Sequence, residues 1–176
     1  MIDLKEKGAP NAVTGYGSVF LLNTDFRVWL TYPQRMEALS DGDDLGYREL
    51  FTDDVPLLCD EIVEQINRFY SEKPLLPRGT GSNEKVLDFD IDADYIWAAF
   101  MQVYGIDLLD CDLHWHKFIV MLNAMPKDTM LSAIISYRTY TGDDKEFKKL
   151  RYEWSLPTEY TDKEKAQIEE FNRIFG

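Results

Sequence analysis

Apolar residues recur at helical spacing along most of the chain. Four segments place them at i, i+3, i+4 and i+7, or at part of that spacing, which is the pattern of a helix with one buried face. Their stripes are Phe26, Trp29 and Leu30; Cys59, Ile62, Val63, Ile66 and Phe69 or Tyr70; Ile96, Ala99, Phe100 and Val103; and Trp115, Phe118, Ile119 and Leu122. Shorter or more polar stretches predict further helices around residues 47–51, 131–138, 145–154 and 168–175.

Residues 12–22 break the helical period and predict a β hairpin. Thr14-Gly15-Tyr16-Gly17 supplies turn residues, and residues 19–22 form a short apolar strand. A hairpin this small cannot bury both of its faces unaided. We therefore expect it either to pair through its edge with a neighbouring subunit or to fold back on the helix at 26–30 of its own chain.

Caps and breakers set the expected ends of the helices. Short polar side chains that accept a hydrogen bond from a first-turn N–H favour helix starts. The expected starts are Asn23 or Thr24, Asp90 or Asp92, Asp110 or Asp112, Asp128, and Asp143 or Asp144. Pro33 should end the first helix, Pro56 fits the first turn of the next long helix, and Gly105 suits a left-handed C-terminal residue. Residues 161–164 match a capping box for the last helix.

These elements predict a mainly α protein, a single domain of six to eight helices with a small N-terminal β hairpin. A chain of 176 residues is of ordinary size for one domain and can bury a core without disulfides. Strands between the helices are too few for a parallel sheet. Within residues 1–176 we expect the hairpin at 12–22, a first helical part at 23–72, a connection at 73–87, central helices at 88–141 and C-terminal helices at 142–176.

Charge narrows the functional classes. The chain has 19 basic and 32 acidic residues and a net charge of −13, which would repel phosphate backbones, so we expect no nucleic-acid partner. No apolar run reaches the roughly 20 residues of a membrane span, and the first residues do not resemble a signal peptide. Two cysteines suit a reducing compartment. We therefore expect a soluble, cytoplasmic protein with no membrane partner.

The acidic excess lies in two blocks, residues 41–64 and 84–112. One interpretation is a solvated loop together with acidic helix starts. The other is an acidic face that selects a basic partner by charge complementarity. The sequence is compatible with both interpretations.

One cluster contains residue types that bind transition metals, namely Asp110, Cys111, Asp112, His114 and His116. Histidines at i and i+2 of a helix point about 200° apart, whereas zinc-binding helices use i and i+4. We expect the two aspartates to start a helix, His114 to lie near its apolar face and His116 to turn away from that face. No metal site is therefore expected.

Searches for other catalytic or cofactor motifs find nothing. There is no phosphate-binding or dinucleotide-binding glycine motif, and residues 88–99 lack the glycine and the closing glutamate of a calcium loop. We expect no catalytic residue, no cofactor and no enzymatic activity. Arg27 and Arg138 lie within apolar helices, where each is expected to pair with a buried acid in a structural role.

Four stretches follow one another in a distinctive order: residues 24–30 (TDFRVWL), 88–108 (DFDIDADYIWAAFMQVYGIDL), 113–126 (LHWHKFIVMLNAMP) and 135–138 (ISYR). In their residues and in their order these stretches resemble the bacteriophage gene-product-fifteen family of long-tailed phages and prophages. The motif residues are Thr24, Asp25, Phe26, Arg27, Trp29, Trp97, Phe100, Tyr104, Gly105, His114, Trp115, Phe118, Tyr137 and Arg138. His116 departs from the family pattern, which has an aromatic residue there, and residues 142–176 match no motif.

The resemblance implies a non-catalytic role as a tail assembly chaperone. Such proteins self-associate in a helical or spiral arrangement and coat the tape-measure protein during tail-tube assembly. The tail-tube protein then displaces them. The implied partners are a second copy of the chain, the tape-measure protein and the tail-tube protein. The implied location is the cytoplasm of the bacterial host, and the protein is expected to be absent from the mature virion.

Two other functional classes compete with this interpretation. An acidic phage protein can mimic DNA and inhibit a basic host factor, and a charge of −13 suits one. Such a mimic should space carboxylates along an elongated face with few aromatic residues, whereas aromatic residues make up 14% of this chain. The other class is a metal-dependent enzyme built on Asp112, His114 and His116, which the i, i+2 spacing of the histidines disfavours.

Overall fold

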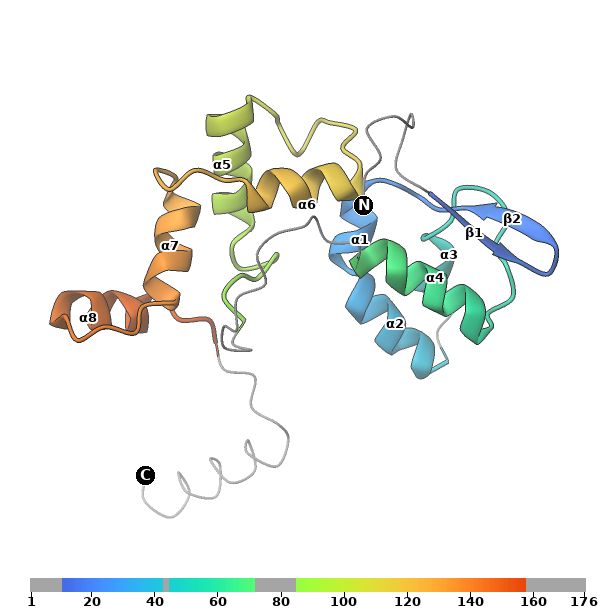
Figure 1. The fold of residues 1–176 in the computed structure, drawn as a ribbon, viewed down its shortest axis with the longest axis horizontal. Coiled ribbons are helices and arrows are strands. Elements are labelled where there is room, and N and C mark those ends of the chain that lie inside the picture. Colours follow the sequence, from blue (N-terminus) through green and yellow to red (C-terminus); the bar gives the residue numbers. More distant parts are fainter. Residues whose placement is uncertain (1–10, 43–44, 72–84, 158–176) are drawn as a thin grey trace, which may run out of the picture.

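The computed structural model describes residues 11–42, 45–71 and 85–157. These residues form eight helices and one two-stranded antiparallel sheet, so the protein is mainly α with an N-terminal hairpin, as the sequence predicts (Figure 1). The hairpin lies toward one end of the molecule's long axis and helix α8 (Lys145–Glu153) toward the other. The expected capping box at 161–164 and the final helix lie outside the described residues, as does most of the expected connection at 73–87.

The hairpin consists of strands β1 (Ala12–Gly15) and β2 (Ser18–Leu21), which pair in antiparallel register. The two turn residues between them have positive φ angles, 53° at Tyr16 and 75° at Gly17. Two successive left-handed residues give a turn whose twist matches that of the flanking strands. Glycine accepts this conformation at no steric cost, and the turn therefore closes where the sequence predicts it.

The hairpin packs on helix α4 (Asp60–Ser71) of its own chain. The Gln65 side-chain amide donates a hydrogen bond to the Thr14 carbonyl oxygen at 2.8 Å and accepts one from the Thr14 N–H at 2.9 Å. Val13 is buried beneath. The expected fold-back thus occurs, but on α4 instead of residues 26–30, and Gln65 occupies the outer edge of β1 that a neighbouring strand would need.

Helices α1 (Phe26–Leu30) and α2 (Tyr32–Ser40) meet at Thr31. Pro33 therefore ends α1 as predicted, but it also lies in the first turn of α2, a helix that the periodicity did not predict. Proline is tolerated there because the first turn has no intrahelical partner for its missing N–H.

Helix α3 (Leu45–Arg48) is a single turn, and α4 begins only at Asp60. The prediction for Pro56 is wrong, because this residue is buried in a segment without regular secondary structure before α4 and not in the first turn of that helix. The acids Asp60 and Glu61 occupy that turn, where the helix dipole favours negative charge. The predicted apolar stripe of α4 is confirmed by the burial of Ile62, Ile66 and Phe69.

The second half contains α5 (Ala93–Tyr104), α6 (Trp115–Asn123), α7 (Met130–Arg138) and α8. Gly105 ends α5 in the left-handed conformation, with φ 64°, as predicted. Asp144 caps α8 as predicted, whereas Asp92 occupies the predicted position before α5 but makes no side-chain cap. At the starts of α1, α6 and α7 the predicted residues Asn23, Thr24, Asp110, Asp112 and Asp128 are wrong, and the caps are Asp25, His114 and Thr129.

These corrections have one physical cause. A cap acts only from the residue immediately before the helix, where its side chain reaches the N–H two or three residues on. The Thr129 hydroxyl accepts from the Ser132 N–H at 3.2 Å, a position that Asp128 cannot take. Residues 105–114 form an irregular segment of turns that returns to α1, so α6 starts later than its nearest aspartates suggest.

Two amphipathic helices joined by a link as short as residues 105–110 are expected to form an antiparallel pair. That expectation is wrong here, because α5 and α6 cross steeply in Figure 1. The helix neighbour of α5 is α7, and that of α6 is α1. The apolar faces of α5 and α6 are nevertheless in contact, because Phe100 stacks on Phe118. One hydrophobic core runs from the hairpin through α7, whereas α8 buries none of its residues.

Candidate interaction surfaces and the motif core

The motif stretches meet at a stack of three phenylalanine rings in the centre of the core. Phe26 of α1 lies 4.7 Å from Phe118 of α6, and Phe100 of α5 lies 5.2 Å from Phe118, measured between ring centroids. Each of the three is at most 4% exposed. Stacked aromatic pairs contribute about 0.5–1.5 kcal/mol beyond their buried area. These motif residues therefore hold the fold together.

A short backbone seam joins the first motif stretch to the third. The Trp115 N–H donates to the Thr24 carbonyl oxygen at 2.8 Å, the Phe26 N–H donates to the Leu113 carbonyl oxygen at 3.0 Å, and Asp25 lies opposite His114 as an isolated bridge. Two segments some ninety positions apart thus pair like strands. This seam positions α1 against α6.

Arg27 reinforces the seam from its solvent side. Its guanidinium donates to the carbonyl oxygens of Leu108 at 2.8 Å and Cys111 at 3.1 Å, and it pairs with Asp25 at 2.9 Å. The Arg27 and Asp25 side chains are 40% and 34% exposed. The expected buried acid is therefore wrong for Arg27, whose main role is to satisfy the carbonyls of the irregular segment before α6.

Three aromatic motif residues hydrogen-bond to backbone carbonyl oxygens through their polar atoms. The Trp29 indole N–H donates to the Asn23 carbonyl oxygen at 2.7 Å, and the Trp115 indole N–H donates to that of Tyr70 at 3.2 Å. The Tyr104 hydroxyl donates to the Met121 carbonyl oxygen at 2.8 Å. Because a buried unpaired donor is costly, these bonds fix which ring can occupy each place.

The histidines lie at the start of α6, and the expectation that His116 turns away from the apolar face is wrong. His116 is only 4% exposed, and its Nε2 lies 2.8 Å from the Phe69 carbonyl oxygen, a contact that assigns the proton to Nε2. His114 is half-buried, and its Nδ1 accepts from the His116 N–H at 3.1 Å. His116 turns inward because α4 packs on that side of α6 and supplies the carbonyl oxygen.

Burial and the neighbouring charges of His116 and Lys117 lower the pKa of His114 to about 4. Protonation would also place a hydrogen on Nδ1 and remove the acceptor that caps α6. The unfolded chain binds this proton at an ordinary pKa of 6.5, so the folded state loses stability as the pH falls from about 6.5 to about 4. Above pH 6.5 the stabilisation is complete.

We expect His114→Asn to remove this pH dependence, because an asparagine oxygen still caps the helix and does not titrate. Between pH 7 and 4.5 the wild-type protein should lose about 1–2 kcal/mol more unfolding free energy than the variant. Urea unfolding at both pH values measures this difference. The lowered pKa of Asp88, about 2, acts below this window and does not interfere. Equal pH slopes in the two proteins would contradict the assignment.

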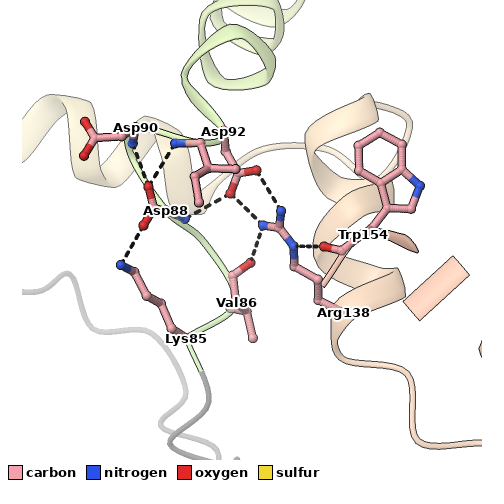
Figure 2. A network of polar contacts seen from close by, with 8 residues as sticks. Lys85, Val86, Asp88, Asp90, Asp92, Arg138 and Trp154 are labelled. Carbon is pink, nitrogen blue, oxygen red and sulfur yellow. Dashed lines mark hydrogen bonds and ion pairs between the residues drawn. The ribbon is translucent and has the colours of Figure 1, made fainter. Parts of the chain in front are cut away.

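A buried ion pair between Arg138 and Asp92 lies where α7 ends and α5 begins (Figure 2). The Arg138 guanidinium, at the end of α7, donates to both carboxylate oxygens of Asp92 at 2.6 and 2.9 Å. It also donates to the carbonyl oxygens of Val86 at 3.0 Å and Trp154 at 2.7 Å. The Arg138 and Asp92 side chains are 6% and 1% exposed, which confirms the buried acid expected for Arg138. Asp92 therefore serves Arg138 and makes no side-chain cap to α5.

The same ion pair organises the chain just before α5. Asp92 accepts from the Asp88 N–H at 3.0 Å, and Asp88 in turn accepts from the N–H groups of Asp90 and Ile91 and from the Lys85 ammonium (Figure 2). The Lys85 ammonium and the Ile91 N–H hold the pKa of Asp88 at about 2. Arg138, Asp92, Asp88 and Lys85 are here named the clamp. The clamp joins the segment before α5, the end of α7 and the end of α8.

The remaining α7 motif residue faces α8. Tyr137 lies 6.3 Å from the Phe147 ring in an edge-on arrangement, and Tyr140 stacks on the same ring at 5.0 Å. Tyr137 and Arg138 together therefore attach α8 to the rest of the protein. Periodicity indicated neither contact, because α8 is too polar to show a buried face.

Trp97 is an aromatic motif residue with an exposed side chain. Its side chain is 38% exposed on α5, one turn from Met101, which is 44% exposed. The indole N–H donates to the Asp107 carboxylate at 2.9 Å, and the same oxygen accepts from the N–H of Leu109, itself 77% exposed. These two hydrogen bonds lower the pKa of Asp107. Trp97, Met101 and Leu109 form a fixed apolar surface, here named the α5 patch.

A second apolar surface is the outer face of the hairpin. Val19 and Leu21 of β2 are 65% and 43% exposed, and their cross-strand partners Thr14 and Ala12 are exposed as well. Alternating residues of a strand point to opposite faces, so docking Val13 on α4 leaves this face outside. Exposed apolar surface of this kind is typical of proteins that bind other proteins.

The acids of the block at 84–112 divide between the two interpretations. Asp88, Asp92 and Asp107 accept hydrogen bonds from their own chain, as helix-start and turn residues do. Asp94 and Asp110 are exposed near the α5 patch. The first interpretation is therefore confirmed for Asp88, Asp92 and Asp107, whereas selection of a basic partner by the exposed acids stays a prediction.

No group of three or more histidine, cysteine or acidic side chains within the described ranges is arranged to hold a metal ion. None of the described helices has the length and hydrophobicity needed to cross a bilayer.

Comparison with known protein families identifies the family of this chain. A family model described as bacteriophage Gp15 protein matches residues 10–162. The chain belongs to the bacteriophage Gp15 protein family. No curated protein and no solved structure gives a significant match.

The Gp15 match confirms the family inferred from the motifs and extends beyond the last of them at Arg138. It covers the hairpin, the three-ring core, the clamp and α8. Most Gp15 motif residues of this chain are thus accounted for by folding, which leaves the exposed surfaces as the candidates for function.

Proposed function

We propose that this Gp15-family protein is a phage tail assembly chaperone. In this role it self-associates and coats the tape-measure protein during assembly of the tail tube, until the tail-tube protein displaces it. It acts in the host cytoplasm without catalysis or cofactor and is absent from the mature virion. Membership of a bacteriophage family is the observation that carries the proposal, together with the chaperone role that the motif resemblance implies.

The surface supports a binding role of this kind. A chaperone for a long apolar client needs exposed apolar side chains on a particle that stays soluble alone. The α5 patch and the outer hairpin face supply such side chains, up to 77% exposed at Leu109. The net charge of −13 opposes nonspecific association between free copies.

The acidic groups fit this role better than a DNA mimic. A mimic presents carboxylates outward at regular spacing, whereas Asp92 is 1% exposed and pairs with Arg138. Asp25 and Asp144 accept from first-turn N–H groups of their own helices. These three acids therefore form hydrogen bonds or ion pairs within their own chain.

Co-expression with the tape-measure protein of the same phage tests the proposal. We expect the tape-measure protein to become soluble and to copurify with this chain, and mass spectrometry of purified virions to find the chain missing. A tape-measure protein that stays insoluble, or abundant chain in virions, would contradict the proposal. Capture of a basic DNA-binding host protein that free DNA displaces would instead favour the inhibitor class.

A further inference from the structure

The α5 patch has an acidic border. Asp94, Trp97 and Met101 lie at i, i+3 and i+7 and so share one side of α5. Asp110 follows Leu109 in the turn that Asp107 organises, and Asp94 and Asp110 are both exposed. The patch is rigid because the Asp107 carboxylate holds both the Trp97 indole and the Leu109 backbone. Rigid aromatic anchors bind partners well because little side-chain freedom remains to be lost.

Helix α8 presents the opposite charge. It carries four basic and two acidic residues. Lys145, Lys148, Lys149 and Tyr152 lie at i, i+3, i+4 and i+7 and form one exposed side, here named the α8 stripe. Tyr152 is 83% exposed, and the Lys149 side chain is 77% exposed. The stripe is thus an aromatic residue among lysines, two of which pair within their own copy, Lys148 with Asp143 and Lys149 with Glu153.

The two surfaces cannot meet within one copy. The other side of α8 faces α7, with Phe147 packed against Tyr140 and the Trp154 carbonyl oxygen bonded to Arg138. Trp154 also contacts Tyr95, which lies two residues from Trp97 and therefore points about 200° away from it around α5. The clamp holds α8 on the side of α5 opposite the patch.

We propose that the α5 patch of one copy binds the α8 stripe of a second copy, with Tyr152 against Trp97 and Met101 and the lysines beside Asp94 and Asp110. Charge complementarity favours this occupant, since an acidic border with an aromatic centre meets a basic border with an aromatic centre. The two surfaces differ, so each copy uses both, and repetition of this head-to-tail contact builds a ring or an open helical array. This inference deepens the proposed function and rests on its self-association.

Charge exchange between the surfaces is the test, using the full chain alone in sedimentation at increasing concentration. The stripe variant is Lys145→Glu with Lys149→Glu, and the patch variant is Asp94→Lys with Asp110→Lys. Each variant alone should raise the dissociation constant for self-association by about tenfold or more, since like charges then face each other. An equal mixture should restore association, because each altered surface again meets its opposite charge.

Matched controls separate surface effects from folding. Lys117→Glu with Lys127→Glu changes the net charge as much as the stripe variant does, at exposed lysines outside the stripe, and should associate like wild type. Trp97→Ala should weaken association about tenfold, whereas Leu57→Ala, at a residue 80% exposed elsewhere, should not. Circular dichroism confirms that each variant is folded. Association of the wild type should also weaken in about 1 M salt, where charges are screened within about 3 Å.

Three results would overturn the inference: a wild type that stays monomeric at every concentration, folded variants that associate like wild type, or a mixture that remains dissociated. The tape-measure protein is absent from this experiment. A failure here therefore leaves the co-expression result to decide the client-binding part of the proposed function separately.

Discussion

Replacing Arg138 with methionine should lower the free energy of unfolding by about 3–5 kcal/mol. The substitution leaves the Asp92 carboxylate, 1% exposed, without its bidentate partner. It also removes donors from the Val86 and Trp154 carbonyl oxygens. The buried charge accounts for most of the loss, because burial of an unpaired carboxylate costs far more than the net gain of the pair. Chemical denaturation followed by circular dichroism measures the change.

Two further variants make this prediction specific to the buried pair. Lys148→Met removes an ion pair with Asp143 whose side chains are 55% and 103% exposed, and should cost about 1 kcal/mol or less. The double variant Asp92→Leu with Arg138→Met should recover part of the loss, since no buried charge remains. A loss below about 1 kcal/mol for Arg138→Met alone would show that the pair is not buried in solution.

Phe118→Ala should destabilise the protein by about 3–5 kcal/mol, the usual cost of removing a large buried ring. Phe118 is 1% exposed and stacks with both Phe26 and Phe100, so a cavity would open between α1, α5 and α6. Three helices that meet at one ring cannot all move to fill it. The free energy of unfolding from a denaturant titration gives the result.

The control for this prediction is Tyr152→Ala, which removes an aromatic ring that is 83% exposed and should change stability by about 0.5 kcal/mol or less. Phe118→Leu should cost less than Phe118→Ala because it fills most of the volume. Similar small losses for Phe118→Ala and Tyr152→Ala would mean that the three-ring stack does not form in solution.

Periodicity predicted the helices whose burial pattern repeats along their own length. The stripes through Ile62, Ile66, Ile96 and Phe118 needed no knowledge of their partners, because an amphipathic helix shows its buried face in the local sequence. Gly105 was predictable for the same reason, since a left-handed residue after a helix is a local requirement. The Arg138 ion pair was predictable in kind, because an arginine in an apolar stripe needs an acid.

The contact partners of the side chains, and the side of a helix that each one faces, could be seen only in the tertiary structure. The sequence contains the ring stack and the clamp as separate residues, but only the fold brings Phe26 to Phe118 and Asp92 to Arg138, across 92 and 46 positions. The start of α6 was misplaced because its cap is a histidine, a residue type without a strong capping signal. His116 was misplaced because a second helix, α4, buries a side of α6 that its own period leaves polar.

The sequence by itself determined the helical class, the hairpin turn, the acidic charge and the family motifs, all of which are properties of local order or composition. The tertiary structure decided which motif residues fold the protein and which face solvent. Trp97 and Phe100 lie three residues apart in one motif, yet one is 38% exposed and the other fully buried. The difference arises because the Phe118 ring of α6 stacks on Phe100. Such a contact between distant segments is not encoded in the period of either segment alone.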